Sequence, residues 1–126
     1  MPFPANALIV DDESHVRTFL RMVLGELGIE TTWEAANGAE GLQLAEKHRP
    51  ALILLDLNMP MVGGLDALSY LQQTQPDTPV VVVTSQNGLQ AVENAVRLGA
   101  AGYILKQNSK TQIVATLRRI LESAED

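Results

Sequence analysis

Five short apolar runs, separated by longer amphipathic stretches, organise the chain. The runs occupy residues 7–10, 29–35, 52–55, 80–83 and 103–105 and predict five β-strands. The first, third and fourth runs are apolar without alternation. This pattern is typical of strands buried on both faces, as in a parallel sheet that is covered by helices.

The stretches between the runs have the three- and four-residue apolar spacing of amphipathic helices. In the first stretch, Arg17, Arg21 and Glu26 fall between the apolar positions, and Gly28 predicts where this helix stops. The apolar positions are Val16, Phe19, Leu20, Val23, Leu24 and Leu27. This helix is therefore expected to present one apolar face to the sheet.

Polar pairs three residues apart mark the starts of three further helices. The first side chain of each pair caps the helix, and the Glu or Gln at the second position reaches back toward it. The pairs are Asn37 with Glu40, Asn87 with Gln90 and Ser109 with Gln112. The remaining helix is predicted from about Leu65 to Gln73, and Gly99 predicts the end of the fourth.

Strands and helices therefore alternate along the chain. This order predicts an α/β fold, a three-layer sandwich with a parallel sheet between helices. Five strands in 126 residues fit the flavodoxin-like order 2-1-3-4-5 in one domain, over residues 1–126 with a core at about 6–122. Ligands of such sheets bind at the carboxyl ends of the strands, next to the point between strands 1 and 3 where the order reverses.

The predicted carboxyl edge of the sheet collects charged and hydroxyl groups. The acidic segment 11–13 directly follows the first run, and Asp56 follows the third. Thr84 and Lys106 come at the ends of the fourth and fifth runs. A single polar residue after a strand is usually a turn former or a helix cap, but groups from four strands at one edge indicate a site.

Clustered carboxylates repel one another, and a divalent cation relieves this repulsion. Oxygen ligands without His or Cys favour a hard ion, Mg²⁺ or Mn²⁺, over zinc. Mg²⁺ commonly uses one or two carboxylates and completes its shell with water and phosphate oxygens. A carboxylate, a hydroxyl and an ammonium beside such an ion predict a phosphoryl site in which the carboxylate is the nucleophile.

Composition narrows the class of protein. The hydrophobic fraction of 46% is enough for one packed core, and the lack of cysteine excludes a disulfide framework and a Cys-ligated zinc site. Fifteen acidic against nine basic residues give a net charge of −6, so direct nucleic-acid binding is not expected. No apolar run approaches the ~20 residues that span a bilayer, and no signal peptide is recognisable. We expect a cytoplasmic protein without membrane insertion.

The residues at the carboxyl edge also carry a family resemblance, together with a few positions around them. These positions are Asp11-Asp12, Asp56-Leu57-Asn58-Met59-Pro60, Gly64, Thr84, Tyr103 and Lys106. With these motifs the chain resembles a response-regulator receiver domain of the CheY-like superfamily, of the stand-alone single-domain type, and the resemblance covers nearly all of its length.

The resemblance implies a phosphorylation site at this edge. Asp56 would accept a phosphoryl group from a phosphohistidine of a sensor histidine kinase or a histidine phosphotransfer protein. Asp12 and Asp56 would ligate Mg²⁺ (or Mn²⁺) together with the backbone carbonyl of Asn58, while Asp11 would act through water. Lys106 would pair with Asp56 and later with a phosphoryl oxygen.

The resemblance also implies how phosphorylation would reach a partner. Thr84 would hydrogen-bond the phosphoryl group and move toward it, and Tyr103 would swing inward into the vacated space. The surface formed by the fourth helix, the fifth strand and the fifth helix would then bind a downstream protein target differently. A phosphoryl group adds roughly −1.5 to −2 charge and three acceptors, so it can bias such a two-state equilibrium. No output domain is expected after the fifth helix, so the signal would pass through a protein contact.

Three positions beside the site modify this picture. The family usually has a Pro joined by a cis bond after the Lys, whereas Gln107 follows Lys106 here. A non-Pro cis bond costs ~2.5–4 kcal/mol, which favours a trans peptide here, although the sequence leaves the isomer open. Gln86 and the side chain of Asn58 border the pocket, and in this family such positions tune how long the phosphoryl group lasts.

The two histidines are interpreted as exposed helical residues. His15 falls in the first turn of the first helix, and His48 falls near the end of the second, in a polar run. Neither is expected to donate a phosphoryl group.

Two other functions fit the motifs less well. One is an inert receiver-like scaffold or dimerisation domain, and the presence of both acidic positions with Thr84 and Lys106 argues against it. The other is a small Mg²⁺-dependent aspartyl phosphatase, but Asn58 stands where such an enzyme has its second Asp, and no cap domain is expected. No P-loop motif occurs, which excludes a P-loop ATPase. We therefore expect no enzyme activity beyond the chain's own phosphorylation and autodephosphorylation.

Overall fold

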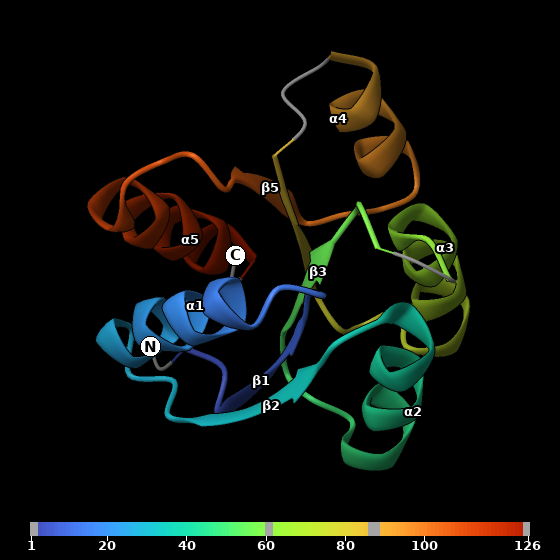
Figure 1. Ribbon diagram of the computed structural model, residues 1–126, viewed down its shortest axis with the longest axis horizontal. Coiled ribbons are helices and arrows are strands. Elements are labelled where there is room, and N and C mark those ends of the chain that lie inside the picture. The colour runs from blue at the N-terminus through green and yellow to red at the C-terminus, as the bar shows by residue number, and fades with distance from the viewer. Residues whose placement is uncertain (1–2, 60–61, 86–88, 125–126) are drawn as a thin grey trace.

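The computed structural model describes residues 3–59, 62–85 and 89–124. Strands and helices alternate along these residues, as the apolar pattern predicts, and a central sheet stands between two layers of helices (Figure 1). The strands are β1 (Asn6–Val10), β2 (Thr31–Ala35), β3 (Ile53–Asp56), β4 (Val80–Thr84) and β5 (Gly102–Leu105). The helices are α1 (Ser14–Glu26), α2 (Gly38–His48), α3 (Gly64–Thr74), α4 (Leu89–Arg97) and α5 (Lys110–Ala124).

The sheet has the predicted topology. All its strand pairs are parallel, and the order is β2-β1-β3-β4-β5, which confirms the flavodoxin-like arrangement. Val10, the last residue of β1, pairs with Ala35 of β2 and with Leu55 of β3. The carboxyl ends of β1 and β3 therefore lie side by side, and the segments that leave them meet at one edge of the sheet.

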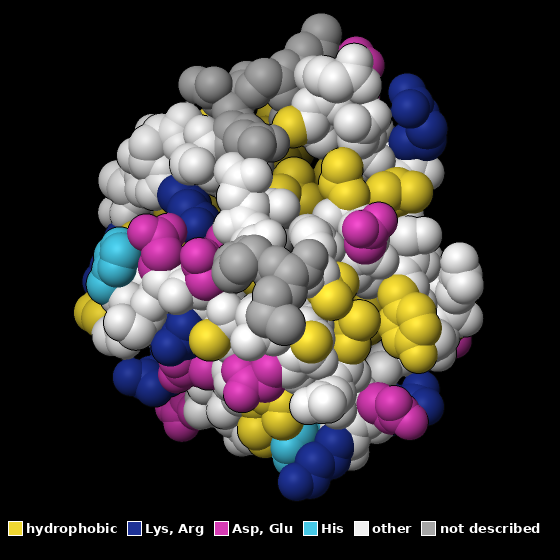
Figure 2. All heavy atoms as spheres, turned by 45° about the vertical axis from the view of Figure 1, so that its right-hand side comes forward, with side chains coloured by type: hydrophobic (Ala, Val, Ile, Leu, Met, Phe, Trp, Pro, Cys, Tyr) yellow, Lys and Arg dark blue, Asp and Glu magenta, His cyan; other side chains and the backbone are white. Residues whose placement is uncertain are grey.

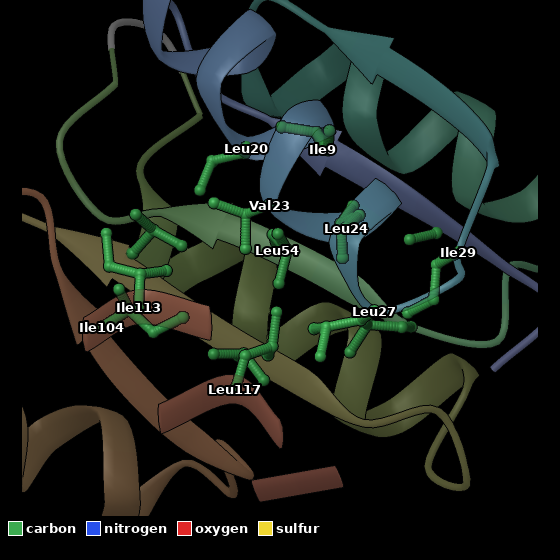
Figure 3. Packing of buried hydrophobic residues seen from close by; sticks show 14 of the residues in the cluster. Ile9, Leu20, Val23, Leu24, Leu27, Ile29, Leu54, Ile104, Ile113 and Leu117 are labelled. Carbon is green, nitrogen blue, oxygen red and sulfur yellow. The ribbon is translucent and has the colours of Figure 1, made fainter. Parts of the chain in front are cut away.

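The sheet is covered by helices on both faces. Along β1, Ala7 and Ile9 pack into a cluster with α1 and α5, while Leu8 and Val10 pack into a second cluster with α2, α3 and α4. Figure 3 shows side chains of the first cluster, from α1, α5 and the strands, packed together. All residues of β3 and β4 are buried, which agrees with the unbroken apolar runs of these strands.

Two strands end one residue later than their apolar runs. Asp56 pairs with Val83 of β4, and Thr84 pairs with Leu105 of β5, so both polar residues are the last in their strands. Both are only 1% exposed. The sheet itself, rather than a loop, therefore fixes the backbone of these two residues.

The predicted capping pairs start two of the helices. Asn37 Oδ1 accepts from the Glu40 N–H at 2.9 Å, and at α5 the Ser109 Oγ accepts from the Gln112 N–H at 3.2 Å. The Ser109 N–H in turn donates to Gln112 Oε1 at 2.9 Å, which completes a capping box. The proposed cap at Asn87 lies outside the described residues.

Glycines with positive φ end α1 and α4, as predicted. Gly28 has φ +84° and Gly99 has φ +96°, a conformation that other residues rarely adopt. After α1 the Gly28 N–H donates to Gly25 O and the Ile29 N–H donates to Leu24 O, which is a Schellman motif. Ile29 therefore takes part in the cap that follows α1. The predicted strand over 29–35 starts two residues too early, because β2 begins at Thr31.

None of the described helices is long and apolar enough to cross a membrane.

The start of α3 packs directly on the end of β3. A Cβ built on Gly64 would overlap the Cα of Leu57 and lie 2.5 Å from the carbonyl oxygen of Asp56. The neighbouring Gly63, in contrast, has nothing within 4 Å of its Cβ position. Only glycine lets the helix approach this closely, and the approach holds the backbone that follows Asp56.

We predict that Gly64→Ala destabilises the protein although alanine is the better helix former. The overlap is with backbone, so relief needs a shift of the β3–α3 connection, and we expect a loss of about 2–3 kcal/mol in the free energy of unfolding. Gly63→Ala is the matched control and should stay within about 1 kcal/mol of the wild type, since its φ of −68° suits any residue. Urea denaturation followed by circular dichroism measures both. An equally stable Gly64→Ala variant would contradict the close approach.

Candidate functional site

Three aspartates meet at the carboxyl edge of β1 and β3. Asp11, Asp12 and Asp56 each offer a carboxylate oxygen, and these oxygens all lie within 4.8 Å of one another. Asp11 and Asp56 are 1% exposed, whereas Asp12 is exposed. Figure 2 shows acidic side chains close beside basic ones on the face that it draws. The structure therefore brings together the acidic residues that the sequence places at this edge.

Lys106 reaches the same cluster from the end of β5. Its Nζ lies 2.9 Å from Asp11 Oδ2, 3.1 Å from Glu13 Oε1 and 3.3 Å from Asp56 Oδ2. Its main-chain N–H donates to the carbonyl oxygen of Thr84 at 3.0 Å, which ties the start of this loop to β4. The peptide bond to Gln107 is trans, the isomer that the sequence favours. Lys106 thus pairs with Asp56, but the same ammonium also lies within ion-pair distance of Asp11 and Glu13.

Main-chain donors hold one oxygen of each buried carboxylate. The Glu13 N–H donates to Asp11 Oδ1 at 2.9 Å, and the Asn58 N–H donates to Asp56 Oδ1 at 3.1 Å. The other oxygen of each, Oδ2, is buried and meets only the Lys106 ammonium among the described residues, at 2.9 Å for Asp11 and 3.3 Å for Asp56. The same ammonium also donates to Glu13 Oε1. Two buried anionic oxygens are therefore left with incomplete coordination.

The charges at this edge do not balance. Burial raises the pKa of Asp56 to about 6, and the negative charge of Asp11 adds to the effect, against the Asn58 N–H and the nearby ammonium. For the Lys106 ammonium, burial lowers the pKa, but the surrounding carboxylates outweigh burial and raise it above its usual value. The hydrogen bond from the same ammonium lowers the pKa of Glu13. One ammonium faces several carboxylates, so a further cation is favoured.

A hard divalent cation fits this donor set. The donors are all oxygens, and two of them are buried with only one shared ammonium beside them among the described residues, which leaves room in their shells for an ion. Asp12 is accessible from solvent, which gives a hydrated ion a route to the cluster. These observations support Mg²⁺ or Mn²⁺ as the ion. Asn58 is exposed beside Asp56, and the use of its carbonyl as a ligand stays a prediction.

Comparison with known proteins gives the family. A family model described as the response regulator receiver domain matches residues 7–118 of the chain. The chain belongs to this family. The receiver-like order of strands and the acidic edge described above agree with the match, and the CheY-like resemblance drawn from the motifs is confirmed.

Individual relatives show how far the similarity extends. The chain is 36% identical over 117 residues to the nitrate/nitrite response regulator protein NarL of Escherichia coli strain K12, covering 92% of this chain and 54% of NarL. It is 27% identical over 113 residues to the chemotaxis protein CheY of Thermotoga maritima, covering 90% of this chain and 94% of CheY. The solved structure of the Vibrio cholerae chemotaxis protein CheY4 has a TM-score of 0.84 at 28% identity, covering 93% of this chain and 98% of CheY4. The chain spans about half the length of NarL and several other curated relatives, but nearly all of CheY.

The two receiver residues expected to switch lie on one face of the sheet. Thr84 follows Val82 by two residues in β4, and Tyr103 pairs with Val82 from β5, so all three side chains point toward the α3 and α4 side. Thr84 is buried at the site, whereas Tyr103 is 42% exposed on the edge strand. The inward movement of Tyr103 stays a prediction. Two other receiver positions, Gln86 and Pro60, lie outside the described residues.

The histidines differ from each other in environment. The His15 side chain is 78% exposed, with its Nε2 3.8 Å from a carboxylate oxygen of Glu13, as expected of a surface helical residue. His48 is partly buried and stacks on Trp33, with ring centroids 4.3 Å apart and planes 12° from parallel. The expectation that His48 is simply exposed is therefore wrong, because the end of α2 packs its ring on the flat face that Trp33 offers from β2.

Sequence reasoning missed two residues that shape the site. Glu13 belongs to the acidic segment after the first run, but the sequence does not indicate its hydrogen bond to Lys106. Arg17 falls between the apolar positions of the first helix, yet its Nη1 donates to the main-chain carbonyl of Asp11 at 2.7 Å. An Arg one helical turn after an acidic loop was the available signal, but its direction depends on how α1 packs.

We predict that Asp56 makes the metal-free protein less stable as pH rises. The pKa of Asp56 is about 6 in the folded protein and about 4 in an unfolded chain, so the folded state binds the proton more tightly. The free energy of unfolding should therefore fall between about pH 4 and pH 6 and then level off. Asp56→Asn should remove this fall and be more stable than the wild type at pH 8 in EDTA, by up to about 3 kcal/mol.

Urea denaturation in EDTA between pH 4 and pH 8 measures the difference. Asp66→Asn, which removes an exposed carboxylate from the first turn of α3, is the control and should keep the wild-type profile. Wild type and Asp56→Asn with parallel pH profiles would contradict the raised pKa.

Proposed function

We propose that this chain is a phosphorylation-activated receiver of a two-component or phosphorelay system. Asp56 accepts a phosphoryl group from a phosphohistidine of a sensor histidine kinase or a histidine phosphotransfer protein. The single observation that carries the proposal is the arrangement of two buried aspartates around one ammonium, which is the one cation among the described residues that an oxygen of each meets. Such a site can bind a cation and, with the negative charge offset in this way, accept a phosphoryl group.

The Asp56 carboxylate is the nucleophile. One of its oxygens forms a bond to phosphorus as the bond from phosphorus to the donor imidazole nitrogen breaks, and the imidazole leaves with that electron pair. The carboxylate must be ionised to attack, and the Asn58 N–H and the Lys106 ammonium both favour the ionised form. Because Asp56 is the last residue of β3, its backbone stays fixed during the transfer.

Lys106 and Thr84 stabilise the transferred group. The ammonium lies within ion-pair distance of the attacking carboxylate, so it can follow the negative charge onto a phosphoryl oxygen. The Thr84 hydroxyl is the proposed second donor. Asp12, Asp56 and the Asn58 carbonyl would hold Mg²⁺, with Asp11 acting through water, and the bound ion would neutralise charge on the same oxygens. We propose no catalysis by this chain beyond its own phosphorylation and autodephosphorylation.

Phosphorylation then changes a surface. The new group brings roughly −1.5 to −2 charge next to Lys106, whose charge is now divided among three carboxylates. The ammonium and Thr84 are drawn toward the phosphoryl oxygens, and Tyr103 turns inward from its exposed position. The face formed by α4, β5 and α5 thereby changes its contacts with a downstream protein target in the cytoplasm. The net charge of −6 makes direct nucleic-acid binding unfavourable.

Phosphorylation by a small donor tests the proposal. The wild type, incubated with acetyl phosphate and Mg²⁺, should gain one labile phosphoryl group, measured by intact mass spectrometry. Asp56→Asn should gain none, EDTA should prevent the reaction, and Asp66→Asn should behave as the wild type. No adduct with either acetyl phosphate or a phosphorylated kinase would favour an inert scaffold, and steady turnover of a phosphorylated metabolite would favour a phosphatase.

The role of Lys106 has its own test. Lys106→Met should slow phosphorylation by acetyl phosphate at least about tenfold, because it removes the only ammonium beside the acceptor among the described residues. Lys110→Met is the matched control. Lys110 is the first residue of α5, and its Nζ pairs with Glu26 Oε2 at 2.8 Å rather than with the aspartates. Equal rates for the two variants would show that the ammonium of Lys106 does not take part.

A further inference from the structure

Arg17 joins three elements around the acidic loop. It lies in the first turn of α1 and reaches back so that its Nη1 donates to the main-chain carbonyl oxygen of Asp11 at 2.7 Å. Its Nε donates to Oε1 of Glu34, in β2, at 3.1 Å. Its side chain is only 17% exposed, so the guanidinium is largely withdrawn from water. The loop after β1 is therefore tied by one side chain to both α1 and β2.

Both main-chain polar groups of Asp11 are held in this way. Its N–H donates to the Ala35 carbonyl oxygen at 3.0 Å, and its carbonyl accepts from Arg17. The carbonyl belongs to the planar peptide that joins Asp11 to Asp12, so fixing it sets the direction in which the chain carries Asp12. Asp12 is exposed and has left the sheet, so the strand ladder does not hold it. Arg17 therefore acts on Asp12 indirectly, because it holds the carbonyl of the peptide that joins Asp11 to Asp12.

A second arginine holds the carboxylate that Arg17 uses. Arg21 Nη1 pairs with Oε2 of Glu34 at 2.8 Å, and the Arg21 side chain is 53% exposed. Arg21 therefore shares the helix, the charge and the carboxylate partner of Arg17 but meets Glu34 from the solvent side. Its substitution separates the effect of the surface ion pair from the effect of the hydrogen bond to Asp11.

From this geometry we infer that Arg17 is a positioning residue for cation binding. It acts on the carboxylates of Asp11 and Asp12 through the main chain, without contact to the ion or to the phosphoryl group. The inference rests on the proposed function, because it concerns the ion that the acidic cluster would hold. Side chains that orient metal ligands commonly contribute about 10–100-fold to metal affinity.

Charge and position predict effects of opposite sign. If Arg17 acted only by its positive charge, its removal would strengthen the binding of a divalent cation, since one repelling charge would be gone. If it acts by holding the peptide between Asp11 and Asp12, its removal weakens binding. A purely structural role would lower the unfolding midpoint but leave the affinity of the folded protein unchanged.

Calorimetric titration of Mg²⁺ into the metal-stripped full chain decides between these cases. We expect Arg17→Met to raise the dissociation constant about tenfold. Arg17→Lys keeps the charge but cannot bond both the Asp11 carbonyl and Glu34, so it should raise the dissociation constant about threefold or more. This variant replaces Arg17→Met in the test if Arg17→Met does not fold. Arg21→Met should stay within about twofold of the wild type. The rate of phosphorylation at saturating Mg²⁺ should recover in both Arg17 variants.

The outcomes separate this inference from the proposed function. An Arg17→Met variant that binds Mg²⁺ as tightly as the wild type, or more tightly, overturns the inference, as does an equal loss in Arg21→Met. A wild type that binds Mg²⁺ but is not phosphorylated overturns the proposed function, and the affinities of the variants still decide the role of Arg17. A wild type that binds no Mg²⁺ overturns both.

Discussion

The burial of two neighbouring carboxylates, Asp11 and Asp56, organises the functional edge of this receiver domain, and their mutual repulsion adds to its effect. Burial makes each charge expensive, and Lys106 offsets only part of the cost because it also pairs with Glu13. One oxygen of each aspartate is held by this shared ammonium alone among the described residues. The site therefore carries excess negative charge that a cation can relieve. The proposed phosphoryl group adds to that charge and competes for the ammonium, which gives phosphorylation its power to change the structure.

The sheet is what keeps the repelling groups together. Parallel order places β1 beside β3, and the register of Val10 with Leu55 brings the following residues to one point. Because both faces of these strands are buried, a slip of one residue would exchange the two hydrophobic clusters. The close approach of Gly64 to the end of β3 adds a second restraint. Packing energy spread over the whole fold thus maintains an electrostatically unfavourable site.

The fold and the acidic edge were predictable because they follow from short-range patterns and from the topology of parallel sheets. Unbroken apolar runs mark the strands, and the switch between strands 1 and 3 brings Asp11 to Asp56 without any knowledge of side-chain contacts. The contacts of Glu13 and Arg17 were not predictable, since they depend on loop conformation and on how α1 packs across the sheet. The ring of His48 on Trp33 likewise depends on how α2 packs beside β2, which no local pattern encodes.

The central claim is that the buried carboxylate of Asp56 takes the phosphoryl group when a divalent cation is present. Borohydride reduces an aspartyl phosphate to homoserine, so reduction followed by peptide mass spectrometry maps the modified position. After incubation with acetyl phosphate, homoserine should be found at position 56, in samples with Mg²⁺ and not in those with EDTA. Homoserine at another aspartate, or a phosphate that resists reduction as a serine or threonine ester does, would contradict the account.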